Sequence, residues 1–526
     1  MISTAPACEL RLTDAADSPL LCETVRRLVD EVEAIDVHTH LFPPSHGSLM
    51  LSGVDALLTY HYLVSEFFMV APDEIDHASF FALDLSSQAD LVWDHLFVRR
   101  SPLSEACIGV LTTMRLLGRV DVAMESGEVG RAGWLPRIRA QEAASTPDET
   151  VEHVFKTAKL KYCIMTNIPF EPNETQHWRP TAPADNKYFK SALRVDPLLK
   201  GDWPAVAAAL TGAGYEATLD GTRAFLVDWI KTMNPVYFMA STPHDFQYPS
   251  PPNADGAPSA SDMLDKVLMP LAEEYGLPIA LKLGAHRCCF PALAPCGGGD
   301  GVIVADTAPL KELCLRYPRV KFLATFLSKV NQHEVCIMAQ KLRNLHIYGC
   351  WWYCNNPSII DEITRMRLEL LGTAFTAQHS DSRILEQLVY KWAHSRICIS
   401  KCLEEQYTKL RRTGWIFTEE ALRMDVWRLF GGSYEEFLHS NPTPPTPPVP
   451  PANAVSVLAE AGAVLAEAKE SDMALNEKIK DAYAEEMNRL IPGEFDYVAG
   501  TLAADATLEA VKRRVASEEK SGDGGL

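Results

Sequence analysis

The sequence lacks the features that mark several protein classes. Its 13 cysteines are scattered without a CxxC pair, so we expect buried thiols in a reducing compartment and no disulfide framework. No apolar run reaches the length of a membrane span. The N-terminal stretch MISTAPACELRLTD has neither a basic start nor an apolar core, so no signal peptide is predicted. Together these absences predict a cytoplasmic protein with no membrane partner.

Positive charge is also scarce. The chain has 49 Lys and Arg against 69 Asp and Glu, a net charge of −20 and a pI of about 5.2. Such a chain repels phosphate backbones, so nucleic acid is not an expected partner. A small anionic substrate remains compatible if arginines or lysines cluster locally. The length of 526 residues, with 47% hydrophobic residues, suits one large globular domain or two ordinary ones.

Composition divides the chain into four parts. Residues 1–33 are predicted to form a leader and one helix, and residues 34–440 to form the catalytic domain. Residues 441–454, NPTPPTPPVPPANA, form a proline-rich linker that should be extended. Residues 455–526 are rich in Ala, Glu and Leu, which predicts an acidic helical C-terminal extension.

Eight short apolar segments of the central part have strand character: 34–40, 160–167, 189–196, 235–242, 278–285, 320–327, 345–352 and 373–381. Most are nearly continuous apolar runs, which is typical of parallel strands buried on both faces. Helical patterns separate many of them, so we predict an α/β fold, a (β/α)8 TIM-type barrel. A doubly wound open sheet is the alternative. The long helical pattern at about 50–158 is predicted to be a large insertion after the first strand.

Ionisable residues gather at one end of these segments, where a barrel carries its active site. His38 and His40 end the first segment, within AIDVHTHLFPP, and Arg194 lies near the end of the third. The motif HSDSR, at the end of the eighth segment, contains Asp381 and Arg383. Core packing does not account for this accumulation of polar groups, so we predict a site there.

A metal site is the first interpretation of His38 and His40. Side chains two residues apart on a strand point to the same side, so both can bind one ion. Asp381 can complete the site, because the first and eighth strands of a closed barrel are neighbours. The alternative is that both histidines are satisfied by hydrogen bonds. The acid on the eighth segment favours one divalent ion, with zinc as the first choice.

The two arginines each have two interpretations. Arg194 ends an apolar strand, so its guanidinium either pairs with nearby Asp196 or captures a substrate carboxylate. Arg383 either holds the substrate or tunes Asp381. The alternative is an ion pair with that acid that stabilises the loop.

Aromatic residues supply further candidates. Tyr62 lies beside His61 in LLTYHYLVSEFF and is either a proton donor or a buried tyrosine with one hydrogen bond. Trp351 and Trp352 can stack on a sugar face or simply pack in the core.

These residues carry a resemblance to a known family. The pieces DVHTHLF, LLTYHYLVSEFF, RRSPLSEAC, ALRVDPLL, YGCWWYCNNP and QHSDSRILEQLVYKW occur in that order over roughly residues 30–430. In this respect the chain resembles the uronate isomerases, a branch of the amidohydrolase superfamily of metal-dependent TIM barrels. The proline-rich linker and the helical extension are not part of the family pattern.

The resemblance implies an activity and roles. The family interconverts D-glucuronate with D-fructuronate and D-galacturonate with D-tagaturonate, so a hexuronate is the expected substrate and a homo-oligomer the expected assembly. His38, His40 and Asp381 would hold one divalent metal, often zinc. Arg194 would bind the substrate carboxylate. Tyr62 and Arg383 would lie at the reacting end, with His61 similar in position, and proton transfer through an enediol fits this set.

Other functions remain open at this level. A mononuclear hydrolase or a decarboxylase of the same superfamily can use one metal ion and an arginine. The fourth segment has no lysine at its end and the sixth has no histidine before His333, which argues against a two-metal hydrolase. A non-catalytic protein that binds sugar acids or acts as a scaffold is a further alternative.

Overall fold

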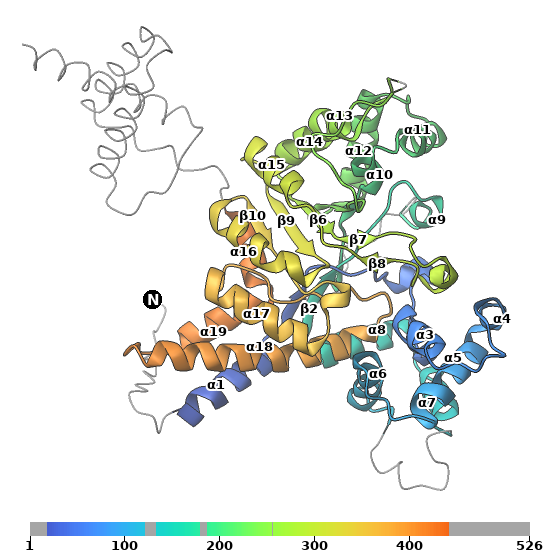
Figure 1. Cartoon of the computed structure of the whole chain (residues 1–526), viewed down its shortest axis with the longest axis vertical. Helices are drawn as coiled ribbons and strands as arrows, with labels where there is room; N and C mark the ends of the chain where they lie inside the picture. Colours follow the sequence, from blue (N-terminus) through green and yellow to red (C-terminus); the bar gives the residue numbers. More distant parts are fainter. Residues whose placement is uncertain (1–17, 121–132, 179–186, 255, 441–526) are drawn as a thin grey trace, which may run out of the picture. The chain divides into compact units, whose positions relative to one another are not determined.

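The computed structural model describes residues 18–120, 133–178, 187–254 and 256–440 (Figure 1). The predicted leader, the proline-rich linker at 441–454 and the helical extension at 455–526 lie outside these residues. Among the described residues, none of the helices is both long and apolar enough to cross a lipid bilayer.

Parallel strands form the centre of the fold, in two sheets. The strands of the three-stranded sheet follow the order β1-β2-β3, and those of the five-stranded sheet the order β10-β9-β6-β5-β4. The bounds are β1 (Ala34–Asp36), β2 (Leu160–Ile164), β3 (Phe189–Lys190), β4 (Leu193–Arg194), β5 (Phe238–Ser241), β6 (Ile279–Leu283), β9 (Phe322–Phe326) and β10 (Leu345–Ile347). A small antiparallel pair, β7 (Ala285–His286) and β8 (Gly301–Val302), follows β6. The predicted mixed α/β class with parallel strands is confirmed.

The strands differ from their predicted bounds in instructive ways. Every residue of β6 and β9 is buried, as expected for parallel strands covered on both faces. The predicted third strand divides into β3 and β4, which pair with different neighbours. The predicted eighth strand, 373–381, forms only one bridge, between Thr376 and Tyr348. The described residues therefore do not form a closed barrel of eight regular strands.

Backbone hydrogen bonds nevertheless connect the two sheets and the last segment. Asn167, after β2, bridges to Leu193 of β4. At the other side, the Asp381 N–H donates to the His38 carbonyl at 3.2 Å and the His40 N–H donates to the Ser382 carbonyl at 2.8 Å. The segment after Thr376 thus lies against the residues that follow β1.

Helices surround the sheets (Figure 1). Between β1 and β2 lie η2 (Pro44–Leu49), α2 (Val54–Leu58), α3 (His61–Phe68), α4 (His77–Phe81), α5 (Leu85–Trp93), η3 (Asp94–Val98), α6 (Glu105–Leu116), α7 (Trp134–Glu142) and α8 (Pro147–Ala158). Several of these helices pack on a hydrophobic cluster of their own, which includes Phe67, Trp93 and Trp134. That this helical stretch is an insertion into a barrel loop stays a prediction.

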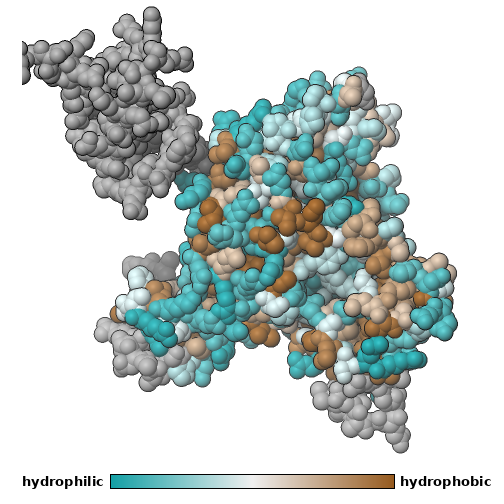
Figure 2. All heavy atoms as spheres, in the orientation of Figure 1, coloured by the Kyte–Doolittle hydropathy of each residue, from teal (hydrophilic) through white to brown (hydrophobic). Residues whose placement is uncertain are grey.

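The remaining helices follow the strands along the chain or precede β1. They are α1 (Ser18–Glu31), α9 (Pro172–Thr175), α10 (Asp196–Lys200), α11 (Trp203–Gly212), α12 (Leu219–Met233), α13 (Ala260–Met263), η6 (Leu264–Leu268), α14 (Met269–Tyr275), η7 (Pro291–Cys296), α15 (Ala308–Arg316), η8 (Lys329–Asn331), α16 (Gln332–Lys341), η9 (Trp352–Cys354), α17 (Pro357–Leu371), α18 (Gln387–Arg411), α19 (Glu419–Trp427), η10 (Arg428–Gly432) and α20 (Ser433–His439). Hydrophilic residues cover most of the described surface on the face in Figure 2.

Two layers of core define the inside and the outside of the sheets. Alternate strand residues such as Ile279, Leu281 and Leu283 of β6 belong to the main cluster, which packs against helices. Residues of the opposite face form a smaller cluster that strands of both sheets share: Ile35, Ile164, Met239, Ala280 and Leu323. Because side chains alternate along a strand, Lys282 points to the same face as Ala280.

The buried histidine of β10, His346, makes the stability of the fold depend on pH. His346 of β10 is 4% exposed and lies 2.9 Å from the Thr376 hydroxyl. Burial lowers its pKa to about 3, with Arg367 adding to the effect. The unfolded chain, with a histidine pKa of about 6.5, binds this proton more readily, so stability is lost as the pH falls below about 6.5. From pH 7.5 to pH 5 the loss from this one group is about 2 kcal/mol.

We therefore expect His346→Gln to make the free energy of unfolding less sensitive to acid. Urea unfolding at both pH values would compare the wild type with the variant. The wild type should lose about 2 kcal/mol more than the variant over this interval. Parallel pH profiles for the two proteins would show that His346 is not kept neutral by the fold.

Candidate metal centre and substrate site

His38, His40 and Asp381 come together as predicted. One ligand atom from each lies within 4.8 Å of the others. The Oδ1 atom of Asp381 is 3.1 Å from His38 Nε2 and 3.4 Å from His40 Nε2. Two nitrogens and one carboxylate oxygen make a donor set that suits a catalytic zinc site with room for further ligands. The residues therefore fit one divalent ion, and we name them the ligand cluster.

The ligand cluster lies just beyond β1, not within it. His38 and His40 follow the last strand residue, Asp36, and this shortens the predicted strand at 34–40. The reason is that the backbone now bonds alternately to two neighbours. The Thr39 N–H donates to the Ile164 carbonyl at 2.7 Å, while the next N–H donates to Ser382. The two histidines are thereby held between β2 and the HSDSR segment.

Asp381 adopts a strained backbone conformation at this point, with φ of 53°. Asp tolerates this left-handed region better than most residues, and such positions concentrate at functional sites. A second buried acid, Asp36, anchors the same segment. It accepts hydrogen bonds from the Ser380 N–H at 3.0 Å and from Trp392 Nε1 at 2.9 Å. Asp36 therefore ties the end of β1 to the loop that carries Asp381 and to α18.

Lys282 of β6 is a part of the centre that the sequence reading did not single out. Its Nζ lies 2.6 Å from His38 Nε2 and 2.5 Å from Asp381 Oδ1, and the side chain is 2% exposed. The ammonium also lies 4.6 Å from the centre of the Trp351 ring, within range of a cation–π interaction. Burial lowers the pKa of Lys282 to about 7, although Asp381 acts in the opposite direction.

The charges of the centre favour metal binding by the three ligands. Burial, together with the charge of Lys282, lowers the pKa of His38 to about 4, so the imidazole is neutral near pH 7. Burial acts in the same direction on His40. Burial opposes ionisation of Asp381, but Lys282 and the two histidines outweigh it and hold the pKa of this carboxyl well below its usual range. Neutral imidazoles and an ionised carboxylate are the states that a metal ion requires.

Arg194 lies near this centre but is already paired. Its Nε and Nη2 donate to the two carboxylate oxygens of Asp196 at 3.1 and 2.7 Å. Asp196 also accepts the Ser241 N–H at 3.0 Å, which fixes the acid in place. The structure thus contains the ion pair that was the alternative for Arg194. A guanidinium has five N–H donors, so its role toward a substrate carboxylate stays a prediction.

Arg383 is exposed, in contrast to the buried residues around it. Its charge acts on the pKa of His40 and on that of Tyr60. The ion pair with Asp381 that was the alternative for Arg383 does not occur among the ion pairs of the described residues. A free cation beside the ligand cluster is available to a bound anion or to charge that develops in a reaction.

His61 is engaged on both sides of its ring. Trp352 Nε1 donates to His61 Nε2 at 3.1 Å, and His61 Nδ1 lies 3.3 Å from the Gly297 carbonyl. The rings of His61 and Trp352 also stack, with their centres 5.3 Å apart. Burial lowers the pKa of His61 to about 3, and Arg383 contributes to this, so the ring is neutral. This geometry favours a role in positioning Trp352 over the predicted catalytic role.

Tyr62 sits next to this pair on α3, in a group of aromatic rings. Its ring is 4.9 Å from that of Tyr60 and 5.2 Å from the Lys391 ammonium of α18. Burial raises the pKa of Tyr62 well above its usual value, and the charge of Asp381 adds to this. Tyr62 therefore keeps its proton at neutral pH, as a proton donor must.

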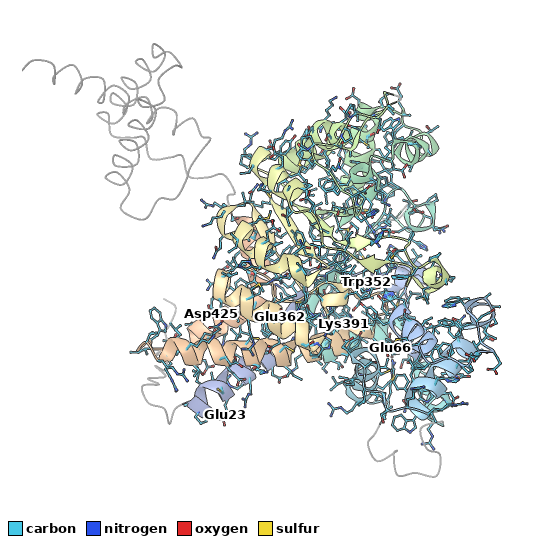
Figure 3. The ribbon with its side chains drawn as sticks, viewed as in Figure 1. Glu23, Glu66, Trp352, Glu362, Lys391 and Asp425 are labelled. Carbon is cyan, nitrogen blue, oxygen red and sulfur yellow. The ribbon has the colours of Figure 1, made fainter. Side chains whose placement is uncertain are left out.

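A cavity of about 700 Å³ opens beside these aromatic residues. It reaches His61, Tyr62 and Trp352 but not the three residues of the ligand cluster. Figure 3 shows Trp352, Lys391 and Glu66 in the same region of the molecule, where the helices after β1 approach the strands. Trp352 lines the cavity, whereas Trp351 is 1% exposed and packs against Lys282. Of the two tryptophans predicted to contact a sugar, Trp352 is thus the better placed.

The residues that the sequence reading missed share one signal. Lys282 lies inside IALKL and Asp36 inside AID, each a charged residue within a buried strand. A buried charged side chain requires a polar or oppositely charged partner, and neither strand contains one. Both positions therefore indicated a partner from another segment. The partners come from segments distant in sequence, which is why the pairing itself was not predictable.

Comparison with solved structures places the chain among known enzymes. The uronate isomerase of Bacillus halodurans C-125 is 39% identical, with a TM-score of 0.74, over 81% of this chain and 97% of that one. The fold is also similar to that of the uronate isomerase of Thermotoga maritima, at 14% identity and a TM-score of 0.64 over 80% of this chain and 97% of that one. The glucuronate isomerase of Caulobacter crescentus is 14% identical, with a TM-score of 0.63, over 85% of this chain and 99% of that one.

No family model matches the chain, and no curated protein does so either. The likeness to the Bacillus halodurans enzyme is nevertheless decisive, because substantial identity extends over nearly the whole of that protein. It agrees with the resemblance that the motifs carry. The chain belongs to the uronate isomerase family.

Proposed function

We propose that this protein is a uronate isomerase that converts a hexuronate aldose to its ketose. The substrates would be D-glucuronate and D-galacturonate, and the products D-fructuronate and D-tagaturonate. The observation that carries the proposal is the ligand cluster of His38, His40 and Asp381, assembled in a chain of this family. The net acidic chain admits an anionic substrate only where cations gather, and Arg194, Lys282 and Arg383 lie around this centre.

The ligand cluster would hold one divalent ion, for which zinc is the first candidate. Once bound, the ion would supply positive charge that stabilises the negative charge of an enediolate. Isomerisation moves a proton between neighbouring carbons, so the protein must also provide an acceptor and a donor of protons.

Asp381 and Tyr62 divide these two roles. Their surroundings push their pKa values apart, so that Asp381 is ionised while Tyr62 keeps its proton. Such a separation is a physical guide to acid and base assignments. Lys282, His38 and His40 all approach Oδ1 of Asp381, which leaves Oδ2 to accept a proton from the sugar. Tyr62 would return a proton to the product. Exchange with water would then remove the proton from Asp381 and restore the one on Tyr62.

Three further residues would hold the substrate. Arg194 would contribute its remaining donors to the carboxylate at the far end of the sugar. Arg383 would act on oxygen atoms at the reacting end, because it is exposed beside His40. Trp352 would form one wall for the sugar, since it lines the cavity next to Tyr62.

We also infer a (β/α)8 barrel in which the segment 373–381 takes the place of the eighth strand. Two observations support this. The hydrogen bonds of Asp381 and His40 connect that segment to the residues after β1, and strands of both sheets share one inner cluster. Closure would place the ligand cluster at the carboxyl ends of the strands, where barrels carry their active sites.

One assay tests the proposed function directly. Purified zinc-loaded protein is incubated separately with glucuronate and galacturonate, and ketose formation is followed together with release of carbon dioxide. We expect ketose from at least one of the two and no carbon dioxide. Carbon dioxide without ketose would establish a decarboxylase instead. No turnover of either sugar, with zinc bound, would contradict the isomerase and leave a hydrolase as the candidate.

A further inference from the structure

Lys282 occupies a position that a metal-dependent centre does not obviously require. Its ammonium contacts two of the three ligand atoms, His38 Nε2 and Asp381 Oδ1, at 2.6 and 2.5 Å. The strand holds it there, because Lys282 pairs in register with Ser241 on one side and Thr325 on the other. The Trp351 ring below it accepts the charge as a cation–π partner. The lysine is therefore built into the centre.

His38 makes this arrangement exclusive. An imidazole nitrogen that accepts a hydrogen bond does so with its single lone pair, and a metal ion would use that same lone pair. The carboxylate of Asp381 has several lone pairs and can serve more than one partner. The Nε2 atom of His38 therefore bonds either to Lys282 or to a metal ion, but not to both.

We propose that Lys282 is an internal competitor of the metal ion for His38 and Asp381, an inference that rests on the metal centre of the proposed function. In the metal-free protein the ammonium compensates the buried charge of Asp381. When a metal binds, Lys282 gives up His38 and keeps its contact with Trp351. Metal binding therefore costs the hydrogen bond between Lys282 and His38, and it brings the ion close to the positive charge of Lys282. Both costs make the affinity for the metal lower than the three ligands alone would give.

The proposal predicts tighter metal binding when the lysine is removed. Lys282→Met removes the charge and keeps an unbranched side chain of similar size. Isothermal titration of zinc into the metal-free protein should give a Kd at least about tenfold lower for the variant than for the wild type. The melting temperature supplies a second measurement. Zinc should raise it more in the variant, whose metal-free form retains an uncompensated buried Asp381.

Two further variants complete the design. Lys282→Gln removes the charge but retains a donor for Asp381, so it serves if the methionine variant does not fold without metal, and its Kd should also fall. Lys321→Met is the matched control, because Lys321 precedes the neighbouring strand β9 at the opposite end of the sheet. Its Kd for zinc should stay within about twofold of the wild type.

The outcomes separate this proposal from its alternatives. An unchanged Kd in both Lys282 variants would overturn competition, and a higher Kd would show that Lys282 is itself a ligand or supports one. An equal gain in Lys321→Met would show that the effect is not local and would also overturn it. These binding constants do not depend on turnover, so a wild type that binds zinc but isomerises neither uronate would refute the proposed function alone.

Discussion

His40→Ala is expected to abolish turnover while the protein stays folded. His40 supplies one of two imidazole nitrogens in the ligand cluster, and the remaining pair of ligands is too few for a stable catalytic site. Loss of groups that merely orient a metal ligand typically costs about 10–100-fold, so loss of the ligand should lower kcat/KM by at least about a thousandfold. The fold should survive, since the His40 side chain lies at the edge of the centre, 13% exposed, and Lys282 still pairs with Asp381.

His333→Ala is the matched control for this experiment. His333 is an exposed histidine on α16, which follows β9, and it is not part of the ligand cluster. We expect this variant to keep its zinc and its turnover. Metal analysis, circular dichroism and uronate turnover on both variants would decide. Full turnover of His40→Ala without measurable metal would contradict the assigned role of the ligand cluster.

Arg383→Met should have the second largest effect. Arg383 is exposed and its charge acts on His40 and Tyr60, so this charge is available to a bound sugar. Removal of one group that stabilises transition-state charge typically lowers kcat by about 100- to 1,000-fold. If Arg383 acts on the enediolate, kcat should fall by this amount with a much smaller change in KM. Stability should change little, because the side chain is exposed.

Steady-state kinetics with each uronate would measure this split between kcat and KM. Arg343→Met is a suitable control, because Arg343 is also exposed but lies before the amino end of β10. The ligand histidines, in contrast, follow the carboxyl end of β1. It should leave both constants unchanged. A rise in KM at constant kcat for Arg383→Met would assign Arg383 to ground-state binding of the sugar and contradict a role in the reaction itself.

Much of this site was accessible from sequence because its signals are local. His38 and His40 are separated by one residue, and HSDSR places Asp381 and Arg383 in one short segment. Apolar strands such as 278–285 and 320–327 were likewise visible as continuous runs, and β6 and β9 lie within them. The prediction that joined distant segments, Asp381 with the two histidines, followed from the closure of a barrel.

The features that sequence could not supply depend on distances between segments. Lys282 was visible as a charge in a buried strand, but its contact with His38 spans 244 positions. The pairing of Arg194 with Asp196 was one of two open interpretations. The geometry of β4 and α10 shows this pair, while capture of a substrate carboxylate by the remaining donors of Arg194 stays a proposal. The predicted bounds of the eighth strand were wrong, because only Thr376 forms a bridge, to Tyr348. The backbone at Asp381 turns into the left-handed region, which a regular strand does not permit.

Zinc titration of the metal-free enzyme tests the central claim most directly. Bound zinc per chain and ketose formation from glucuronate and galacturonate are measured on the same samples as zinc is added stepwise. We expect no turnover without metal, a rise in proportion to bound zinc and a plateau at one ion per chain. Full ketose formation before any zinc is bound, or none from either sugar at the plateau, would contradict it.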